Sequence, residues 1–372
     1  MTGLTLARGE ARRDRGRLLL LLAAVALLLF LAGFLQSLVA TLQGRFTGAL
    51  RHQSGAVLVL SAASQRNIED SQLSPTVIRA VGATQGIAES APLAEGAFTL
   101  RVGGKLQRVV LIGYQPRAAG EPQPLLSGRR AVTVGEAVAS TGIGSSGLSL
   151  GDTAQLEPGG IHLHIVGVLS GAELAASPTL FVPYQTFVAA AHAADPAGTG
   201  APVSALAVDP RPGLAANTLA QRISRTVPQV TALTRGQAAA DSPEVTATTN
   251  SLGVILFLAE LAVVVVIAFF FALVVTQRRP SLALLRAVGV PSRALAGSLL
   301  TQAVLVVLLA ALVGGVATAA AGHIGGTLSY QMAVSRYLTT AGLALALAVI
   351  AASVVLRRVL RVEPVEAMRA IR

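Results

Sequence analysis

The sequence contains no cysteine and no tryptophan, and few of its residues are charged. Without cysteine, the chain cannot form disulfide bonds, cysteine-bound zinc sites, iron–sulfur clusters or thiol nucleophiles. Charged residues make up 13% of the 372 residues, whereas a soluble domain carries about 25%. Hydrophobic residues make up 53%, and the mean hydropathy is +0.65. This composition excludes an ordinary water-soluble enzyme and a disordered chain.

The sequence also lacks a nucleotide-binding motif. Lys105 is the only lysine, and Leu106 follows it where a Walker motif requires serine or threonine. A G-x-G-x-x-G pattern occurs at Gly142–Gly147. The dinucleotide fingerprint requires a strand before this pattern and a helix after it. We expect a helical segment over 135–140 and a short strand after Gly151, so we interpret the pattern as a loop.

Motifs for metal binding and hydrolysis are equally sparse. His162 and His164 lie two residues apart, so they share one face of a predicted strand. Two imidazoles could begin a metal site, but no third ligand is evident in the sequence. We therefore interpret this segment as a surface strand with polar side chains outward. Serine, histidine and aspartate all occur, but apparent triads of these residues are expected by chance in a chain of this length, so no hydrolase is predicted.

Long stretches without charge are the main feature that is present. About 20 apolar residues suffice for a helix to cross the hydrocarbon core. The first stretch, 18–44, is preceded by arginines like a signal peptide, but its apolar run exceeds the usual 7–15 residues of such a segment. We therefore interpret it as an uncleaved anchor. The predicted spans are 18–41, 251–276, 295–321 and 338–356.

The distribution of charge predicts the orientation of these spans. The segments 1–17, 277–294 and 357–372 together carry a net charge of +10, whereas 42–250 carries +1. By the positive-inside rule, both termini and the 277–294 loop are cytoplasmic and 42–250 lies outside. This predicts a multi-pass protein of the plasma (inner) membrane. Nucleic acid is not an expected partner, because the basic residues flank spans and lack interleaved aromatic residues.

The outer segment 42–250 reads as a mixed α/β domain, because short apolar or alternating runs are separated by Gly, Pro and Asp. Surface-loop composition marks 193–202, and 238–250 is expected to continue as a helix into the second span. The predicted strands are 56–60, 98–102, 107–112, 131–134, 161–168, 179–182 and 204–208. The predicted helices are 75–81, 184–192 and 214–226.

Glu260 is the one acidic residue inside a predicted span. A carboxylate within the membrane is expensive, so it is expected to face a partner helix or a wet cavity. It lies roughly 13 Å into the span from Ser251, at 1.5 Å per residue. Two interpretations remain open. Glu260 is either a protonated or arginine-paired group that fixes helix packing, or a substrate contact or proton carrier.

Small residues are concentrated near the third predicted span. Gly322 and Gly326 form a G-x-x-x-G pattern, and Gly314 and Gly315 precede them. Such residues let two helices approach closely in lipid. The pattern fits either a dimer contact or packing within one chain.

Two cytoplasmic motifs carry a resemblance to a known family. The segment 276–290 resembles "RRREIGLLRALGA", matching at Leu285, Arg286, Ala287 and Gly289, although Pro280 replaces the usual acidic or polar residue. The tail 362–369 resembles "hPxEALR", matching at Pro364, Glu366, Ala367 and Arg369. With one span, an outer domain and three further spans, the chain resembles FtsX/MacB-type ABC transporter permeases. It is closest in layout to the HrtB/DevC-like branch.

The resemblance implies an α-helical membrane protein with four transmembrane helices and a mixed α/β extracytoplasmic domain, 42–250, between helices 1 and 2. It implies that 1–17 is a cytoplasmic amphipathic segment, 322–337 a short outer loop and 357–372 a cytoplasmic tail. It also implies a homodimer bound to a cytoplasmic ABC ATPase subunit. ATP and Mg²⁺ would then bind the partner ATPase, with no cofactor and no catalysis on this chain.

In such permeases the 277–294 segment is a coupling helix that rests on the ATPase. The residues carried over to that role are Arg278, Arg279, Leu285, Arg286, Ala287 and Gly289. A short basic amphipathic helix could dock on an acidic groove. The alternative is a surface helix held by anionic membrane lipid.

The expected function is export of an amphiphile, hemin-like or lipid-like, driven by ATP hydrolysis on the partner. The alternative is an FtsX-like mechanotransmitter that regulates an outer-surface partner such as a cell-wall hydrolase. Axial ligation of hemin would need His, Met, Tyr or a carboxylate. The candidates are His52, Glu260 and Met332, and none of them is distinctive in the sequence.

Overall fold

The structure is a computed structural model, and it describes residues 15–197, 203–277, 292–324 and 333–361. The chain divides into two compact units. We call residues 1–41 with 251–372 the helical unit, and residues 42–250 the inserted domain.

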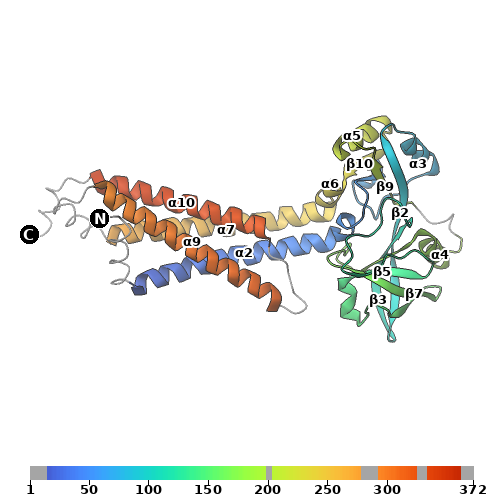
Figure 1. The fold of residues 1–372 in the computed structure, drawn as a ribbon, viewed down its shortest axis with the longest axis horizontal. Helices are drawn as coiled ribbons and strands as arrows, with labels where there is room; N and C mark the ends of the chain where they lie inside the picture. Colours follow the sequence, from blue (N-terminus) through green and yellow to red (C-terminus); the bar gives the residue numbers. More distant parts are fainter. Residues whose placement is uncertain (1–14, 198–202, 278–291, 325–332, 362–372) are drawn as a thin grey trace, which may run out of the picture. The chain divides into compact units, whose positions relative to one another are not determined.

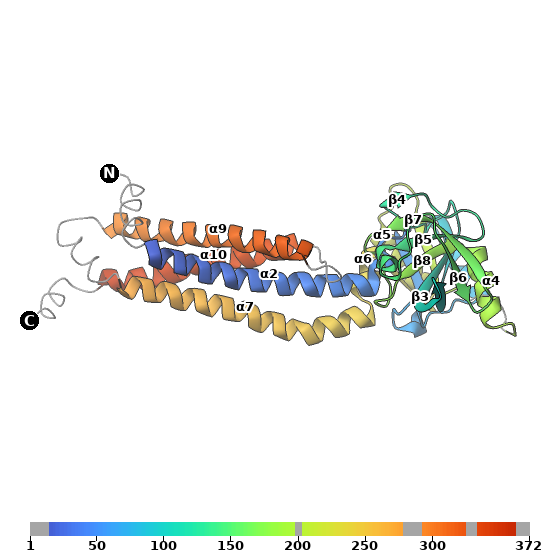
Figure 2. The same ribbon diagram turned by 90° about the horizontal axis from the view of Figure 1, so that it is seen from below.

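Four long helices form the described part of the helical unit: α2 (Arg15–Arg51), α7 (Pro243–Gln277), α9 (Ser292–Ile324) and α10 (Val334–Arg361). Figures 1 and 2 show these helices side by side in both views. By length and composition, three of them could cross a membrane, over Leu22–Arg51, Val245–Val266 and Leu300–Gly322. On α10 the apolar stretch is shorter, Val334–Ile350.

On α2, α9 and α10, one stripe of each helix is buried against the other helices of this unit. On α2 the buried stripe follows helical spacing through Val25, Leu29, Ala32, Gln36 and Val39. Leucines on the remaining surface of α2 are exposed, so the helix is apolar on both sides. Small residues dominate the matching stripes of α9 and α10; the buried ones are Ala310, Thr318, Thr340, Ala344 and Ala348.

Glycines bring α2, α9 and α10 into close contact. A Cβ at Gly33 of α2 would lie 2.7 Å from Cδ2 of Tyr337, and one at Gly314 of α9 would lie 2.9 Å from the carbonyl oxygen of Ala26. The Tyr337 hydroxyl donates to the carbonyl of Ala311 (2.6 Å). Packing within one chain thus uses the predicted Gly314–Gly315 pair, whereas Gly326 lies outside the described residues.

The inserted domain is built on a mixed sheet in which ten described strands take part. Their order is β10-β1-β9-β2-β3-β8-β5-β7-β4, and β6 pairs with β2 and β7. The pairs β3·β8 and β5·β7 are parallel, and the other pairs are antiparallel. The strands are β1 (Val57–Ser61), β2 (Ile87–Val102), β3 (Lys105–Tyr114), β4 (Ser127–Gly128), β5 (Glu136–Ser140), β6 (Thr153–Glu157), β7 (Ile161–Leu169), β8 (Thr179–Pro183), β9 (Ala205–Pro210) and β10 (Val230–Thr234).

Four shorter helices accompany the sheet: α3 (Pro75–Gly82), α4 (Tyr184–Ala194), α5 (Ala216–Thr226) and α6 (Arg235–Ala240) (Figure 1). On α5, Leu219 and Ile223 are fully buried against a core that includes Val57 and Val208 of β1 and β9. On α4, Phe187 is buried against β2 and β3, where the absence of a side chain at Gly113 makes room for its ring.

The mixed α/β architecture predicted for this segment is confirmed. Strands form at six of the seven predicted positions, and helices form at all three, with boundaries that differ by a few residues. The strand β10 and the first half of β2 were not predicted. In the sheet, β10 pairs with β1 at the end of the strand order.

Two adjacent predictions were wrong: 131–134 is not a strand, and 135–140 is not helical but contains β5. The Glu136 carboxylate accepts the backbone N–H groups of Val132 (2.9 Å) and Thr133 (3.2 Å), which a strand would give to a neighbour. The alanine-rich β5 is buried between β7 and β8, so tertiary pairing outweighs its helical propensity.

The expected continuous helix over 238–250 was also wrong. Helix α6 ends at Ala240, and α7 begins at Pro243 after a break at Asp241 and Ser242. Proline disfavours helical backbone in the residue before it and suits the first position of a helix. Pro243 therefore separates two helices.

Candidate functional site

Glu260 lies in a polar cluster formed by three helices of the helical unit. Its Oε1 accepts a hydrogen bond from Nε2 of Gln36 on α2 (2.9 Å). The hydroxyl of Thr340 on α10 lies 3.5 Å from the same oxygen. Side chains that are far apart in the sequence therefore meet at one carboxylate, and we call Gln36, Glu260 and Thr340 the carboxylate cluster.

Gln36 is the central residue of the carboxylate cluster. Its Nε2 donates to Glu260 and also to Oγ1 of Thr340 (2.7 Å). Its side chain is only 4% exposed, and its Oε1 has no hydrogen-bond partner in the described part of the protein. A buried carbonyl oxygen without a donor costs free energy, so Gln36 holds an acceptor that another group could use.

Helical spacing explains how these side chains reach each other. Gln36 follows Gly33 by three residues on α2, and Thr340 follows Tyr337 by three residues on α10. Residues three apart lie on one face of a helix. Because Gly33 and Tyr337 are in contact, Gln36 and Thr340 both lie on the facing sides of the two helices, where the Gln36 amide reaches the Thr340 hydroxyl.

The neighbours of Glu260 are neutral. Within the described ranges, no arginine or lysine nitrogen lies within 4.0 Å of its carboxylate. The sequence left two forms of Glu260 as a group that fixes helix packing, protonated or paired with arginine. The described residues give no support to the arginine-paired form. The cluster can stabilise a carboxyl group by hydrogen bonds, and Glu260 itself is partly exposed.

A serine next to this cluster fixes the start of α10. The Ser37 hydroxyl donates to the carbonyl of Gly33 (2.7 Å) and accepts from the backbone N–H of Ala333 (3.2 Å). The latter N–H belongs to a helix end, where backbone donors have no partner within the helix. The position of Thr340 in the cluster thus depends on α2 through two separate contacts.

Sequence reasoning found Glu260 but missed Gln36 and Thr340. A signal was present, since Gln36 is a polar residue within the uncharged stretch 18–44. Its burial could not be predicted, because α2 is apolar on both its exposed and buried faces.

The predicted coupling segment cannot be placed. Arg278, Arg279, Leu285, Arg286, Ala287 and Gly289 all lie outside the described residues, as does Met332. Their contact with an ATPase stays a prediction. The same holds for the motif at 362–369.

The other candidates from the sequence lie in the inserted domain. His162 and His164 are both exposed on β7 and do not share a cluster of three or more metal-binding side chains within the described ranges. The glycines at 142–147 follow the strand β5 and form a short 3-10 helix that leads to β6. His52 follows α2 directly, and its Nδ1 bonds the carbonyl of Gly48 (2.8 Å).

Two family models match this chain. A MacB-like periplasmic core domain matches residues 18–226, and an FtsX-like permease C-terminal domain matches residues 253–364. The first alone covers more than half of the sequence. The chain belongs to the FtsX/MacB-type family of ABC transporter permeases.

Similar proteins in mycobacteria are also designated ABC transporter permeases. The chain is 27% identical over 291 residues to uncharacterized ABC transporter permeases of Mycobacterium tuberculosis and Mycobacterium bovis. The match covers 78% of this chain and 76% of each relative. Together with its long apolar helices, this makes the chain an ABC transporter permease and a membrane protein.

Two solved structures are similar to part of the chain. The extracellular domain of the noncanonic ABC-type transporter YknZ from Gram-positive bacteria is 12% identical, with a TM-score of 0.33, covering 48% of this chain and 98% of that one. The periplasmic region of MacB from Actinobacillus actinomycetemcomitans is 15% identical, with a TM-score of 0.36, covering 50% of this chain and 92% of that one.

Proposed function

We propose that this permease is the non-catalytic membrane subunit of an exporter for an amphiphile. ATP hydrolysis on a partner ATPase would drive export of a hemin-like or lipid-like molecule from the membrane. The carboxylate cluster carries this proposal. A carboxyl group within an apolar helix, held by a buried amide and a hydroxyl from two other helices, is a costly arrangement and points to a role beyond packing.

The chemistry of the cluster suits the polar head of an amphiphile. Glu260 is partly exposed, whereas Gln36 and Thr340 are buried behind it. A donor group on a ligand could bind the free carboxylate lone pairs, and a proton could be taken up at the same oxygen atoms. Binding at Glu260 would change hydrogen bonds that reach α2 and α10, which links a ligand to helix position.

The topology and assembly belong to the same proposal. Four spans, with α10 as the fourth, would place both termini in the cytoplasm and the inserted domain outside, as the charge distribution predicts. Residues 278–289 would contact the ATPase. The exposed apolar surface of α7, which includes Val254, Phe257 and Phe269, would face lipid or a second copy in a homodimer.

ATPase measurements on the purified permease–ATPase complex in nanodiscs test the proposal. We expect hemin or one lipid of a panel to stimulate hydrolysis. In Glu260→Gln, we expect stimulation to require about tenfold more amphiphile, the equivalent of one hydrogen bond to a charged group. The variant should still co-purify with the ATPase, because glutamine keeps the size and a hydrogen-bonding carbonyl.

Thr301→Val is the matched control. Thr301 is an exposed threonine on α9 whose hydroxyl bonds only its own helix, at Gly297 (2.8 Å). This variant should respond like the wild type. Unchanged stimulation in Glu260→Gln would remove the carboxylate cluster from the transport mechanism, and absence of any response from an active complex would contradict export.

The second candidate is mechanical signalling to an outer-surface partner. Large apolar side chains are exposed between residues 126 and 150 of the inserted domain; they are Leu126, Val132, Val134 and Leu150. Exposed apolar side chains mark a protein contact where they form one continuous patch. An ATPase that ignores every amphiphile, in a complex that captures a cell-wall hydrolase, would favour this candidate.

A further inference from the structure

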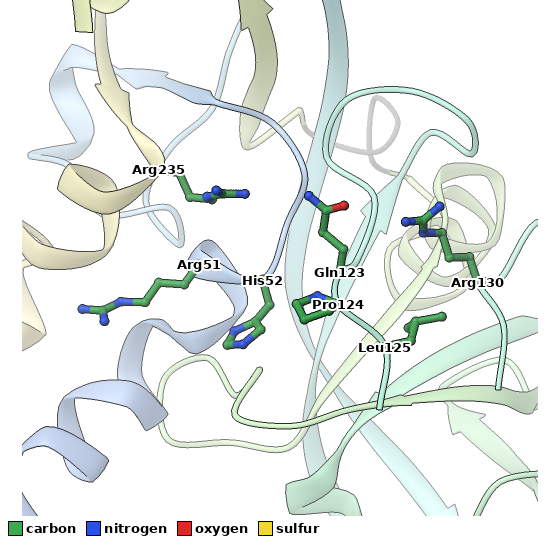
Figure 3. A pocket seen from close by; sticks show the side chains of 7 residues that line it. All are labelled: Arg51, His52, Gln123, Pro124, Leu125, Arg130 and Arg235. Carbon is green, nitrogen blue, oxygen red and sulfur yellow. The ribbon is translucent and has the colours of Figure 1, made fainter. Parts of the chain in front are cut away.

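A basic cavity lies in the inserted domain, apart from the carboxylate cluster. Its volume is about 570 Å³, within the usual range for small-molecule sites. Three separate segments line it: the end of α2 with the residue that follows, the residues on both sides of β4, and the first residue of α6. The lining residues are Arg51, His52, Gln123, Pro124, Leu125, Arg130 and Arg235 (Figure 3). We call this the arginine cavity.

Three arginines and no carboxylate line the arginine cavity; the Arg235 guanidinium faces Gln123, whereas the Arg51 side chain extends away from the other lining side chains (Figure 3). Arg130 is neutralised by Glu121, at 3.2 Å. For Arg51 and Arg235, no carboxylate oxygen lies within 4.0 Å among the described side chains. Arg235 in the cavity and Arg51 at its edge therefore both carry a positive charge without a carboxylate partner among these side chains.

This concentration of charge is local. Residues 42–250 carry 14 basic and 13 acidic side chains, a net charge of +1. A domain so close to neutral has no general basic surface from which three arginines would gather by chance. The charges come together here because three segments of the fold meet.

Hydrogen bonds tie these segments to one another before any ligand binds. Arg235 Nη1 donates to the carbonyl of Gln53 (2.9 Å), which holds its guanidinium at the cavity. The backbone N–H of Gln123 donates to the carbonyl of His52 (2.7 Å). A cavity that is already formed loses less conformational entropy when it binds.

Helix capping explains only part of this arrangement. Cations are favoured near a helix C-terminus, and Arg51 lies in the last turn of α2. The His52 ring bonds the carbonyl of Gly48 through Nδ1, which leaves Nε2 free of that contact. Arg235 and Arg130 belong to other segments, so the dipole of α2 does not account for them.

The remaining walls indicate the kind of anion. Figure 3 shows the Arg235 guanidinium and the Gln123 amide extending toward each other from opposite sides. Pro124 and Leu125 add an apolar surface beside them. Guanidinium groups pair well with phosphate and carboxylate oxygens, and the apolar wall suits a carbon-containing substituent.

We propose that the arginine cavity binds an oxyanion, a phosphate or carboxylate group, through Arg235 with Gln123 as a neutral donor, and that the exposed side chain of Arg51 turns toward the bound group. The group belongs either to an anionic amphiphile or to a small free anion. This site is separate from the carboxylate cluster and does not depend on the export proposal.

Calorimetric titration of the full-length protein in phosphatidylcholine nanodiscs tests the proposal. The probes are dihexanoyl phosphatidic acid, inorganic phosphate and, as a zwitterionic control, dihexanoyl phosphatidylcholine. Binding of phosphatidic acid but not of phosphate would assign the site to an amphiphile, and binding of both would assign it to any oxyanion. Both results support the proposal.

Variants locate the binding. Arg51→Gln should weaken binding of the anion about tenfold, and the Arg51→Gln/Arg235→Gln double variant about a hundredfold or more, since each loses a charge-assisted bond. Arg51 is exposed, so its single variant should fold even if the double variant does not. Arg225→Gln, which changes an exposed arginine on α5 that is not among the lining residues, should bind like the wild type.

Two results would overturn the proposal. One is the absence of binding by either anionic probe to the wild-type protein. The other is equal affinity in wild type and Arg51→Gln, or an equal loss in Arg225→Gln, which would indicate unspecific attraction to surface charge. The calorimetric experiment measures anion binding and not ATPase stimulation. A negative result for the arginine cavity can therefore be told apart from a negative result for the export proposal.

Discussion

Different kinds of side chain pack the interior of the inserted domain and the interior of the helical unit. In the inserted domain, large aliphatic and aromatic side chains such as Leu58, Leu60 and Phe181 are fully buried on the sheet. In the helical unit, glycine and alanine make the closest helix contacts beside a few buried larger side chains such as Leu29, with hydrogen bonds at Tyr337 and Gln36. Large apolar side chains on α9, such as Leu312, are exposed.

The solvent of each unit explains this difference. In water, burying apolar surface is the main driving force, so large side chains are most useful inside. In lipid, a leucine gains little by leaving the acyl chains, and helices associate through close packing and polar contacts. The same residue type therefore has a different effect in each unit.

The largest expected effect comes from making the same leucine-to-alanine substitution in each unit and comparing the loss of stability. Leu60→Ala in the fully buried core of the inserted domain should reduce stability by about 2–5 kcal/mol, because it removes apolar contacts and leaves a cavity. Leu312→Ala on α9, where the leucine is 64% exposed, should change stability by less than about 1 kcal/mol. Hydrogen exchange of β1 and α9 in nanodiscs measures both.

A large effect of Leu312→Ala would break the comparison. It would mean that this leucine contacts protein, for example a second copy of the chain, and not lipid. Chemical cross-linking at that position would then identify the contact.

The next effect concerns glycine packing within the helical unit. Gly33→Ala should destabilise the protein by about 1–3 kcal/mol, because its Cβ would overlap the ring of Tyr337 and the neighbouring Thr318 hydroxyl. Gly44→Ala on the same helix α2 is the matched control, since its added Cβ meets no atom within 4 Å beyond the neighbouring residues and backbone of its own helix. The midpoint of heat-induced loss of monodisperse protein in detergent checks both variants.

The two glycine variants should shift in opposite directions. Alanine is favoured over glycine inside a helix by about 1 kcal/mol, so Gly44→Ala should be neutral or stabilising. If both variants lose stability equally, the contact between α2 and α10 does not depend on close approach at Gly33.

The smallest expected effect is a pH dependence in the inserted domain. Burial, aided by the negative charges of Glu69 and Asp70 and opposed by Arg108, raises the pKa of Glu95 on β2 to about 7 from its ordinary 4.5. The folded state holds this proton more tightly than the unfolded state, so stability falls as pH rises between these two values. Glu95→Gln should lack this dependence and be more stable at pH 8 by about 1–2 kcal/mol.

Urea unfolding of the full-length protein at pH 5, 6, 7 and 8, followed by pulsed proteolysis, measures this dependence. Glu89→Gln, an exposed glutamate on the same strand β2, is the control and should follow the wild type. An unchanged pH profile in Glu95→Gln would show that other groups control the stability of the domain in this range.

The sequence predicted the candidate site only in part. A lone glutamate in an apolar stretch is visible by composition, so Glu260 was identifiable. Its partners were not, because the meeting of Gln36 and Thr340 depends on which faces of α2 and α10 touch. The arginine cavity was hidden for the same reason, since Arg51, Arg130 and Arg235 belong to three separate segments.

The sequence by itself determined the membrane class, the mixed α/β insertion and the family. Long uncharged runs, alternating apolar strands and local cytoplasmic motifs are properties of neighbouring residues, and they survive without tertiary contacts. The tertiary structure alone decided that 136–140 is a strand and which polar groups meet. Those outcomes depend on long-range pairing and on the choice between two apolar helix faces, which local patterns do not encode.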